Sequence, residues 1–403
     1  MQKNATIQGL LDQVEALYDH PRNRANLAKW QPMGLRTRDK WRGVPRPFTS
    51  PGETPIVVNL EQSLLCDLFH YSVHDYFTDT GIYLEYYLRA QIYRFELIQD
   101  DVPLLLHIPA FRNIVFESAL FGSSAIYADD RDPWIARQPV ITDLAKVGDL
   151  PAADFESAPG MALARQTYEY ILAQVIGRHF TVSFVEWLRG PLGVAMSLYG
   201  MQEFLLALGE NPSGALRLLE RVTEARLEWE HLRAAYLGEE QPLTAAIFND
   251  EVNTPTLSPH MYRDLVLPCE QHIIAAHGGL HYFHSCGDTT KMLPHIATLS
   301  PTLFHVGPWT DAQQAAQVMS PLGSALEVCV HAVDDVFDAT PEQMEKRIRE
   351  RISTAVAGGA KAISLEAAAL DRMHGAADDL AAVRKWVAVA RRSLPDLADA
   401  ISR

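Results

Sequence analysis

The chain has 403 residues, 48% of them hydrophobic, which is enough to bury the core of one large α/β domain or of two ordinary ones. Its formal net charge of −15, with no run of basic residues, excludes a surface for nucleic acid or for an anionic membrane. The four cysteines are irregularly spaced, and the polar first ten residues carry neither a signal nor an anchor. We therefore expect a cytoplasmic protein without disulfides.

The order of predicted elements favours an α/β barrel. Residues 1–54 mix charges with several prolines, which predicts a helix followed by an irregular arm over the barrel mouth or an interface. From residue 55 onward, short apolar runs alternate with helical stretches, as in a parallel sheet of βα units. The runs number eight, which is the number that closes a barrel. They are Ile56–Leu60, Val102–Leu106, Phe180–Val185, Leu243–Phe248, Leu280–Phe283, Leu303–Val306, Ala325–Val330 and Ala362–Leu365.

We therefore expect residues 55–403 to form a (β/α)₈ TIM barrel, with residues 1–54 as an N-terminal helical and irregular extension. A doubly wound open sheet is the alternative, although no glycine-rich dinucleotide motif follows any of these strands.

Helix signals support this reading in the second half of the chain. Ser258 and Pro259 predict a helix start, and that helix should end near Gly278. Thr340 to Gln343 has capping-box spacing before a helix that should stop at Gly358. Earlier in the chain, the charged segment from Arg217 to Arg233 predicts a solvent-exposed helix face.

Polar residues follow the predicted strands repeatedly. In a barrel, the loops at the carboxyl ends of the strands form the concave surface that binds ligands. We interpret a set of residues at these ends as substrate-binding, with the two tryptophans as walls of the cleft. The set is Glu186, Trp187, Arg189, Asn253, His305, Trp309 and His331. For Arg189 the alternative is a helix-start arginine paired with a neighbouring acid.

The pair His284-x-Cys286 carries the most specific signal. Alternation along a strand places residues two apart on the same side, so the imidazole and the thiolate are positioned to bind one Zn²⁺. A zinc-bound thiolate or substrate thiol is a nucleophile at neutral pH, which suits methyl transfer. The alternative is that both side chains fill the top of the barrel and hydrogen-bond locally. The candidates for the third ligand, all at neighbouring strand ends, are Cys329, His331, His305 and Glu366. Of these we predict Glu366 or Cys329.

Asp250 and Glu251 follow the fourth strand as a pair of acids. We predict that they and Cys286 are the catalytic residues, with the acids moving protons or orienting the methyl donor. A turn or a helix cap is the alternative role of Asp250.

At His284-Ser285-Cys286-Gly287-Asp288 the sequence resembles the uroporphyrinogen decarboxylase superfamily, in particular its cobalamin-dependent and coenzyme M-type methyltransferase branch. Four further segments match that family in order and spacing, and the resemblance covers roughly Val102 to Val387. They are Arg189-Gly190-Pro191-Leu192, Leu257-Ser258-Pro259 with Val266-Leu267-Pro268, Trp309-Thr310-Asp311 and Thr340-Pro341-Glu342. The resemblance implies a (β/α)₈ barrel and a zinc site that begins at His284.

Two departures from the family pattern bear on function. The arginine-bearing amino-terminal segment of true uroporphyrinogen decarboxylases is absent, although Arg22, Arg24, Arg36, Arg38 and Arg42 lie in that region. In the methyltransferase branch the last zinc ligand is a cysteine after the eighth strand, where this chain has Glu366-Ala367. Either Glu366 or Cys329 therefore substitutes for that cysteine, or the metal has been lost.

Our hypothesis is a zinc-dependent methyltransferase or demethylase that moves a methyl group between a small methylated compound and a corrinoid or thiol. A metal-free decarboxylase of a tetrapyrrole or another polycarboxylate is the first alternative. A non-catalytic barrel that binds a corrinoid or a partner is the second. The partners implied are a small-molecule substrate, a corrinoid protein and a second copy of the chain in a homodimer.

Overall fold

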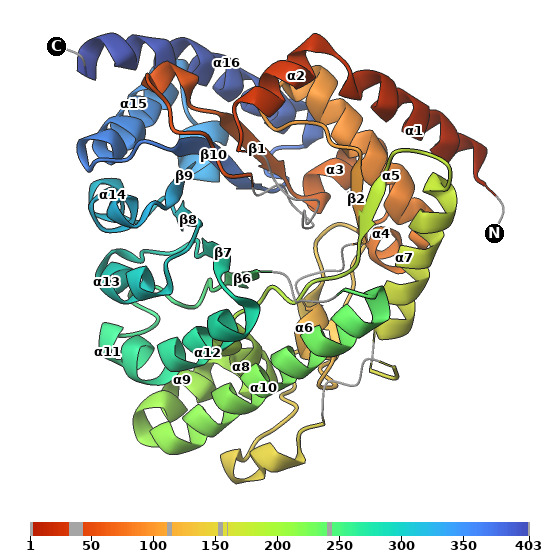
Figure 1. Ribbon diagram of the computed structural model, residues 1–403, viewed down its shortest axis with the longest axis vertical. Coiled ribbons are helices and arrows are strands. Elements are labelled where there is room, and N and C mark those ends of the chain that lie inside the picture. Colours follow the sequence, from red (N-terminus) through yellow and green to blue (C-terminus); the bar gives the residue numbers. More distant parts are fainter. Residues whose placement is uncertain are drawn as a thin grey trace.

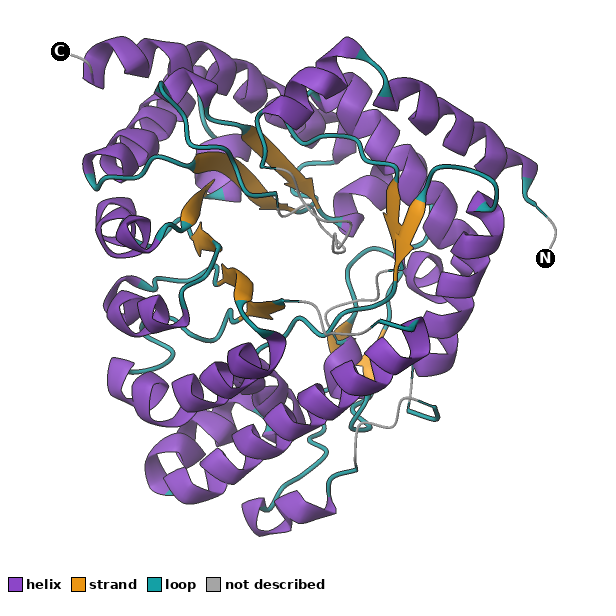
Figure 2. Ribbon diagram, in the orientation of Figure 1, coloured by secondary structure: helices purple, strands orange, loops and turns teal. Residues whose placement is uncertain are grey.

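The fold is built around one curled parallel sheet with helices on its outer side (Figures 1 and 2). The computed structural model describes residues 3–31, 43–110, 115–151, 156–158, 160–239 and 244–401. Six strands form the curled sheet in the order β1-β10-β9-β8-β7-β6, β2 pairs with β5 in parallel, and β3 pairs with β4 antiparallel. The strands are β1 Ile56–Leu60, β2 His107–Pro109, β3 Ala125–Ile126, β4 Trp134–Ile135, β5 Thr181–Ser183, β6 Ala245–Phe248, β7 Leu280–His284, β8 Leu303–Val306, β9 Ala325–Val330 and β10 Ile363–Leu370.

The predicted α/β class with a parallel sheet is confirmed, and the doubly wound alternative is wrong, because the strand order shows no switch point. The ladder of the described residues is continuous over six strands, so the closed (β/α)₈ barrel stays a prediction. Segments next to the β2–β5 pair contact the two edges of the sheet. After β5, Leu188 and Gly190 exchange backbone hydrogen bonds with Phe248, and before β2 the backbone N–H of Asp101 donates to the carbonyl of Ile56.

Carboxylates replace a neighbouring strand along the free edge of β1. The backbone N–H of Ile56 donates to Asp101 Oδ2 at 2.8 Å, and that of Val58 donates to Asp100 Oδ2 at 3.1 Å. Burial raises the pKa of Asp100 to about 7, against the opposing charge of Arg94. These two acids therefore satisfy edge donors that a strand carbonyl would otherwise accept.

The second predicted strand is misplaced. The segment Val102–Leu106 lies just before β2; only the carbonyl of Leu106 pairs with a strand, by accepting the N–H of Thr181 in β5, while its earlier backbone bonds to helix α2 (Pro21–Ala28). Asn23 donates from Nδ2 to the carbonyl of Leu104 at 2.9 Å and accepts from its N–H at 2.8 Å. β1, β8 and β9 have the predicted bounds, and β10 runs five residues further than predicted, to Leu370. Leu243, the predicted start of the fourth strand, lies outside the described residues.

The helix signals are confirmed where capping chemistry predicted them. Ser258 caps the segment before the helix that ends at Gly278, and Thr340 forms a capping box with Gln343. The α-helices are α1 Ala5–Tyr18, α2 Pro21–Ala28, α3 Gln62–Phe69, α4 Val73–Thr78, α5 Thr80–Tyr93, α6 Phe116–Ala119, α7 Met161–Val175, α8 Pro191–Tyr199, α9 Met201–Glu210, α10 Pro212–Leu237, α11 Pro259–Met261, α12 Leu267–His277, α13 Leu293–Ile296, α14 Ala312–Met319, α15 Pro341–Ala357 and α16 Ala376–Ile401. Single π-turns span Arg94–Ile98, Tyr262–Val266 and Val333–Phe337, and 3₁₀ turns span Pro51–Glu53, Leu144–Asp149, Thr290–Met292, Ala297–Leu299 and Ser320–Leu322.

The prediction that Arg217 to Arg233 is a solvated face is wrong for two of its arginines. Arg226 and Arg233 on α10 are each 1% exposed. Arg226 donates to the carbonyl of Ala246 in β6, and Arg233 donates to that of Val185 after β5. Arg351 on α15 does the same at the end of β8. Buried guanidinium groups therefore satisfy carbonyls at the ends of strands, which a reading based on charge alone does not reveal.

The amino-terminal helices pack on the outside of the fold, beside α5 and α7 (Figure 1). Ile7, Leu11 and Val14 of α1 share a hydrophobic cluster with Tyr83 and Leu88 of α5. The predicted irregular arm falls largely on residues 32–42, which lie outside the described residues. Within the described residues, no single helix is long and apolar enough to cross a membrane, while α8 and α9, bent by 108° to each other, pass that test as a pair by length and composition alone.

Candidate metal centre

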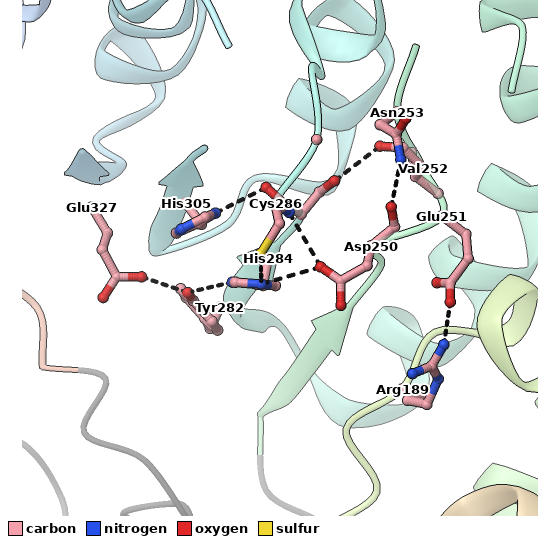
Figure 3. Close-up of polar contacts among 12 residues, drawn as sticks. Arg189, Asp250, Glu251, Val252, Asn253, Tyr282, His284, Cys286, His305 and Glu327 are labelled. Carbon is pink, nitrogen blue, oxygen red and sulfur yellow. Dashed lines mark hydrogen bonds and ion pairs between the residues drawn. The ribbon is translucent and has the colours of Figure 1, made fainter. Parts of the chain in front are cut away.

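His284 and Cys286 lie side by side at the carboxyl end of β7 (Figure 3). Strand alternation carries both side chains to one face, and His284 Nε2 lies 3.1 Å from Cys286 Sγ. His284 is buried, whereas Cys286 is exposed. The predicted convergence of the imidazole and the sulfur is therefore confirmed.

Asp250 joins this pair from the loop that follows β6. Its Oδ1 lies 3.3 Å from His284 Nε2 and accepts the backbone N–H of Cys286 at 3.2 Å. Asn253 donates a hydrogen bond to the carbonyl of Asp250 and so shapes the turn that carries it. We call Asp250, His284 and Cys286 the first donor group, since their ligand atoms all lie within 4.8 Å of one another.

Tyr282 and Glu327 orient the imidazole of His284, and the sequence prediction missed both. The Tyr282 hydroxyl donates to Glu327 on β9, so its oxygen is left to accept from His284 Nδ1 at 3.0 Å. A neutral His284 consequently carries its proton on Nδ1 and presents the lone pair of Nε2 to Cys286 and Asp250. Tyr282 stands two residues before His284 on β7, and this spacing is the signal that predicts a shared face.

The chemistry of the first donor group fits zinc. It offers one nitrogen, one sulfur and one carboxylate oxygen, all of which zinc accepts. Donor atoms around one tetrahedral zinc ion lie about 3.3 to 3.6 Å apart, close to the spacings found here. The hydrogen bond at His284 Nδ1 is the kind of outer contact that metal-binding histidines make.

His305, Cys329 and Glu366 form a second donor group, with ligand atoms again within 4.8 Å of one another. Glu366 and Cys329 were predicted as alternative third ligands beside His284 and Cys286. The structure instead brings them together with His305 on β8, β9 and β10, next to the first donor group. The prediction that either residue completes the His284 site stays untested, and Asp250 is the donor closest to that pair.

Arg189 and Glu251 form an ion pair at the side of the first donor group (Figure 3). The carboxylate of Glu117 accepts the backbone N–H groups of Leu188 and Arg189 and fixes the turn before α8. Gly193 makes room for the pair, because a Cβ there would lie 2.7 Å from both Arg189 and Glu251. The alternative of an arginine paired with a nearby acid is therefore the arrangement that the structure shows.

Charges in the centre act on its acids and thiols. Burial acts to raise the pKa of Asp250, but a His284 protonated on both ring nitrogens, which donates from Nε2 to Asp250, and Arg189 hold that pKa well below its usual range. Loss of water and the charges of Asp250, Cys329 and Glu366 raise the pKa of the Cys286 thiol. Burial also raises the pKa of Glu251. Asp250 is therefore a carboxylate and not an acid at neutral pH, and a bound cation would favour the thiolate of Cys286.

Of the two tryptophans predicted to wall the cleft, Trp187 lies in the core and Trp309 lies on the surface. Trp187 is 1% exposed and packs edge-on against Phe121 and Trp229, so the prediction that it walls the cleft is wrong. Trp309 is 59% exposed and lies against the ring of His331 at 5.0 Å between centroids. Glu186 follows β5 and is half-buried.

Comparisons with known proteins are consistent with this architecture. The family model described as uroporphyrinogen decarboxylase (URO-D) matches residues 107–364. A methylated-thiol–coenzyme M methyltransferase of Methanosarcina mazei is 26% identical over 182 residues, which are 44% of this chain and 47% of that protein. The match thus spans about half the length of this curated relative. The solved structure of a methyltransferase from Methanosarcina mazei superposes with a TM-score of 0.59 at 16% identity, covering 84% of this chain and 94% of that chain, and this likeness shows the fold.

Proposed function

The chain belongs to the uroporphyrinogen decarboxylase family, whose model covers more than half of it, and we propose that it is a zinc-dependent methyltransferase of that family. In this proposal it moves a methyl group between a small methylated compound and a corrinoid or a thiol such as coenzyme M. The curated relative, named as a methyltransferase acting between a methylated thiol and coenzyme M, supports this choice. We also propose that the β2–β5 pair completes a (β/α)₈ barrel around the site.

The observation that carries the proposal is the convergence of His284 Nε2, Cys286 Sγ and Asp250 Oδ1 at the carboxyl edge of the sheet. These three residues would hold the zinc ion. Zinc at this place would lower the pKa of a bound substrate thiol, so that the thiolate is available at neutral pH. Asp250 and Cys286 are both exposed, which leaves an open side for substrate.

The protein's own residues prepare this chemistry. Tyr282 and Glu327 hold His284 in the tautomer that offers Nε2 to a metal. Asp250 remains ionised, so it contributes negative charge and a fixed acceptor for the N–H of Cys286. In the overall reaction the thiol releases a proton to solvent, its sulfur bonds to the methyl carbon, and the donor keeps the electron pair of the broken bond. Trp309, exposed beside His331, is the aromatic surface that we propose for the methyl donor.

Decarboxylation of a polycarboxylate, the alternative within this family, needs several arginines at the site, because each substrate carboxylate requires a charged partner. Arg189 lies beside the first donor group but is paired with Glu251. Arg22 lies over the ring of Phe95 and donates to its carbonyl. Arg36, Arg38 and Arg42 lie outside the described residues. The described contacts therefore favour methyl transfer.

The test combines metal content with a methyl-transfer assay. We expect the purified protein to retain zinc and to demethylate methylcobalamin in the presence of coenzyme M, followed by the cobalamin absorption spectrum. His284→Ala, Cys286→Ala and Asp250→Asn should each lower zinc affinity by at least about tenfold and abolish or strongly reduce turnover. Cys269→Ala, a buried thiol on α12, is the matched control and should change neither.

A protein without zinc above trace levels, and indifferent to a chelator, would contradict the zinc site. If methyl transfer were absent and the His284 and Cys286 variants kept every ligand affinity, the non-catalytic binding barrel would replace this proposal. The corrinoid protein and the homodimer remain proposals that the same preparations test by co-purification and by molecular mass in solution.

A further inference from the structure

The second donor group lies on three adjacent strands and is almost fully enclosed. His305 and Glu366 are each 1% exposed, and Cys329 is 4% exposed. Glu366 on β10 stands directly opposite Cys329 on β9 in the ladder, and His305 on β8 stands opposite Glu327, two residues before Cys329. Residues opposite each other, or two apart on one strand, share a face of the sheet. The register therefore directs all three side chains to one place inside the fold.

Hydrogen bonding aims the imidazole of His305 at the carboxylate of Glu366. His305 Nδ1 lies 2.9 Å from the carbonyl oxygen of Ser285, and because a carbonyl only accepts, Nδ1 carries the proton. Nε2 then faces Glu366 Oε2 at 3.7 Å, which is too long for a normal hydrogen bond. Donor atoms around one tetrahedral zinc ion are expected about 3.3 to 3.6 Å apart, which is close to this separation.

An outer contact holds Glu366 in place. The amide of Asn59, at the end of β1, donates to Glu366 Oε1, which leaves Oε2 toward His305. This arrangement of a ligand carboxylate anchored by a neighbouring amide is the kind of support that metal sites show. Asn59 is itself buried, as an anchoring residue requires.

The two donor groups are neighbours. The rings of His284 and His305 lie 4.2 Å apart between centroids, tilted by 31°. Each group combines one imidazole, one thiol and one carboxylate, which are donor types that zinc accepts.

We propose that His305, Cys329 and Glu366 bind a second divalent cation, zinc by the chemistry of its donors, beside the ion held by His284, Cys286 and Asp250. The enclosure of the second donor group leaves no open side for substrate, so this ion has a positioning role. It fixes His305 against His284 and adds positive charge next to the first donor group. The inference goes beyond the proposed function, since the second site does not depend on which reaction the first site performs.

The experiment counts zinc per chain by elemental analysis of protein dialysed against zinc-free buffer, for the wild type and three variants. We expect about two ions in the wild type and in the Cys269→Ala control, and about one in Cys286→Ala and in Cys329→Ala. Glu366→Gln replaces Cys329→Ala if that variant does not fold, and X-ray absorption should show about one sulfur per zinc in the wild type.

Three outcomes overturn the second site, and they differ in what they say about the first. In the first outcome, the wild type binds about one ion, which Cys286→Ala loses and Cys329→Ala keeps. This result removes the second site and leaves the proposed function intact. In the second outcome, the wild type binds about one ion with two sulfurs per zinc, and both variants lose it. This result indicates a single site shared by Cys286 and Cys329. A wild type without zinc contradicts both this inference and the zinc part of the proposed function.

Discussion

One phenol decides which nitrogen of His284 faces the other donors. The Tyr282 hydroxyl donates to Glu327 and accepts from His284 Nδ1, so a single proton arrangement satisfies all three groups. Phe248 lies against the same imidazole at 5.0 Å between centroids and restricts its rotation. The metal-binding form of His284 is therefore set before any metal arrives.

Tyr282→Phe should lower zinc affinity at the first donor group by about 10- to 100-fold, because the imidazole loses the contact that fixes its tautomer. The measurement is a competition titration with a zinc chelator of known affinity. Tyr83→Phe is the matched control, since that buried hydroxyl donates to the carbonyl of Pro109 instead. Equal affinities in Tyr282→Phe and the wild type would show that the hydroxyl does not orient His284.

Among the elements, the end of β8 is packed against the loop that carries Cys286. Arg351 of α15 donates to the carbonyls of Val306, Gly307 and Thr310 and so pins this strand end. A Cβ on Gly307 would lie 2.8 Å from the carbonyl oxygen of Cys286. The spacing between the two strand ends therefore requires glycine at this position.

Gly307→Ala should displace the Cys286 loop. The added Cβ would clash with the backbone carbonyl of Cys286, which cannot rotate away as a side chain could. We expect lower zinc affinity together with a lower midpoint of thermal unfolding. Gly9→Ala in α1, where nothing lies within 4 Å of the added Cβ, should be neutral or stabilising by up to about 1 kcal/mol. A Gly307→Ala protein with unchanged zinc binding would mean that the loop tolerates the shift.

A buried carboxyl couples α12 to the loop that carries Asp250. Glu270 accepts hydrogen bonds from Tyr262 and from Asn249, the residue before Asp250. Burial raises the pKa of Glu270 from 4.5 to about 7, although both hydrogen bonds oppose this. The folded protein therefore keeps a proton that the unfolded chain loses as pH rises from 4.5 to 7, and stability falls over that window.

Glu270→Gln removes this titration, since an amide stays neutral. The free energy of unfolding of the variant, relative to wild type, should rise between pH 4.5 and 7 by an amount on the order of 2 kcal/mol and then level off. Urea unfolding at a series of pH values measures the difference. A constant difference over that range would show that Glu270 is already ionised in the folded protein.

At the scale of the whole molecule, the amino-terminal helices are part of the same packed structure as the sheet. The side chain of Asn23 in α2 takes the place of a strand partner for Leu104, and it also donates to the carbonyl of Tyr18. α1 contributes to the hydrophobic cluster around Tyr83. We therefore expect the extension and the sheet to unfold together.

Asn23→Ala should destabilise the protein by about 2 kcal/mol, because a buried backbone N–H and carbonyl of Leu104 lose their partner. Asn4→Ala, which removes an exposed cap of α1, should cost about 1 kcal/mol or less. Denaturant unfolding should remain a single transition in both variants. A separate early transition in Asn23→Ala would show that the extension is an independent unit.

The sequence by itself determined the features that follow from local geometry. Alternation along one strand placed His284 and Cys286 together, and capping chemistry located the helix starts at Ser258 and Thr340. Five ordered segments indicated the family, which the match over residues 107–364 confirms. These rules succeed because each acts within one strand, one helix end or one short segment.

Only the tertiary structure decided which residues meet across strands. It placed Asp250 beside His284, grouped His305 with Cys329 and Glu366, and buried Trp187 and Arg226 in the core. The register between strands and the packing of helices bring such residues together, and both depend on contacts distant in sequence. A pattern along the chain can name candidate ligands, but the physical pairing of donors is a property of the folded sheet.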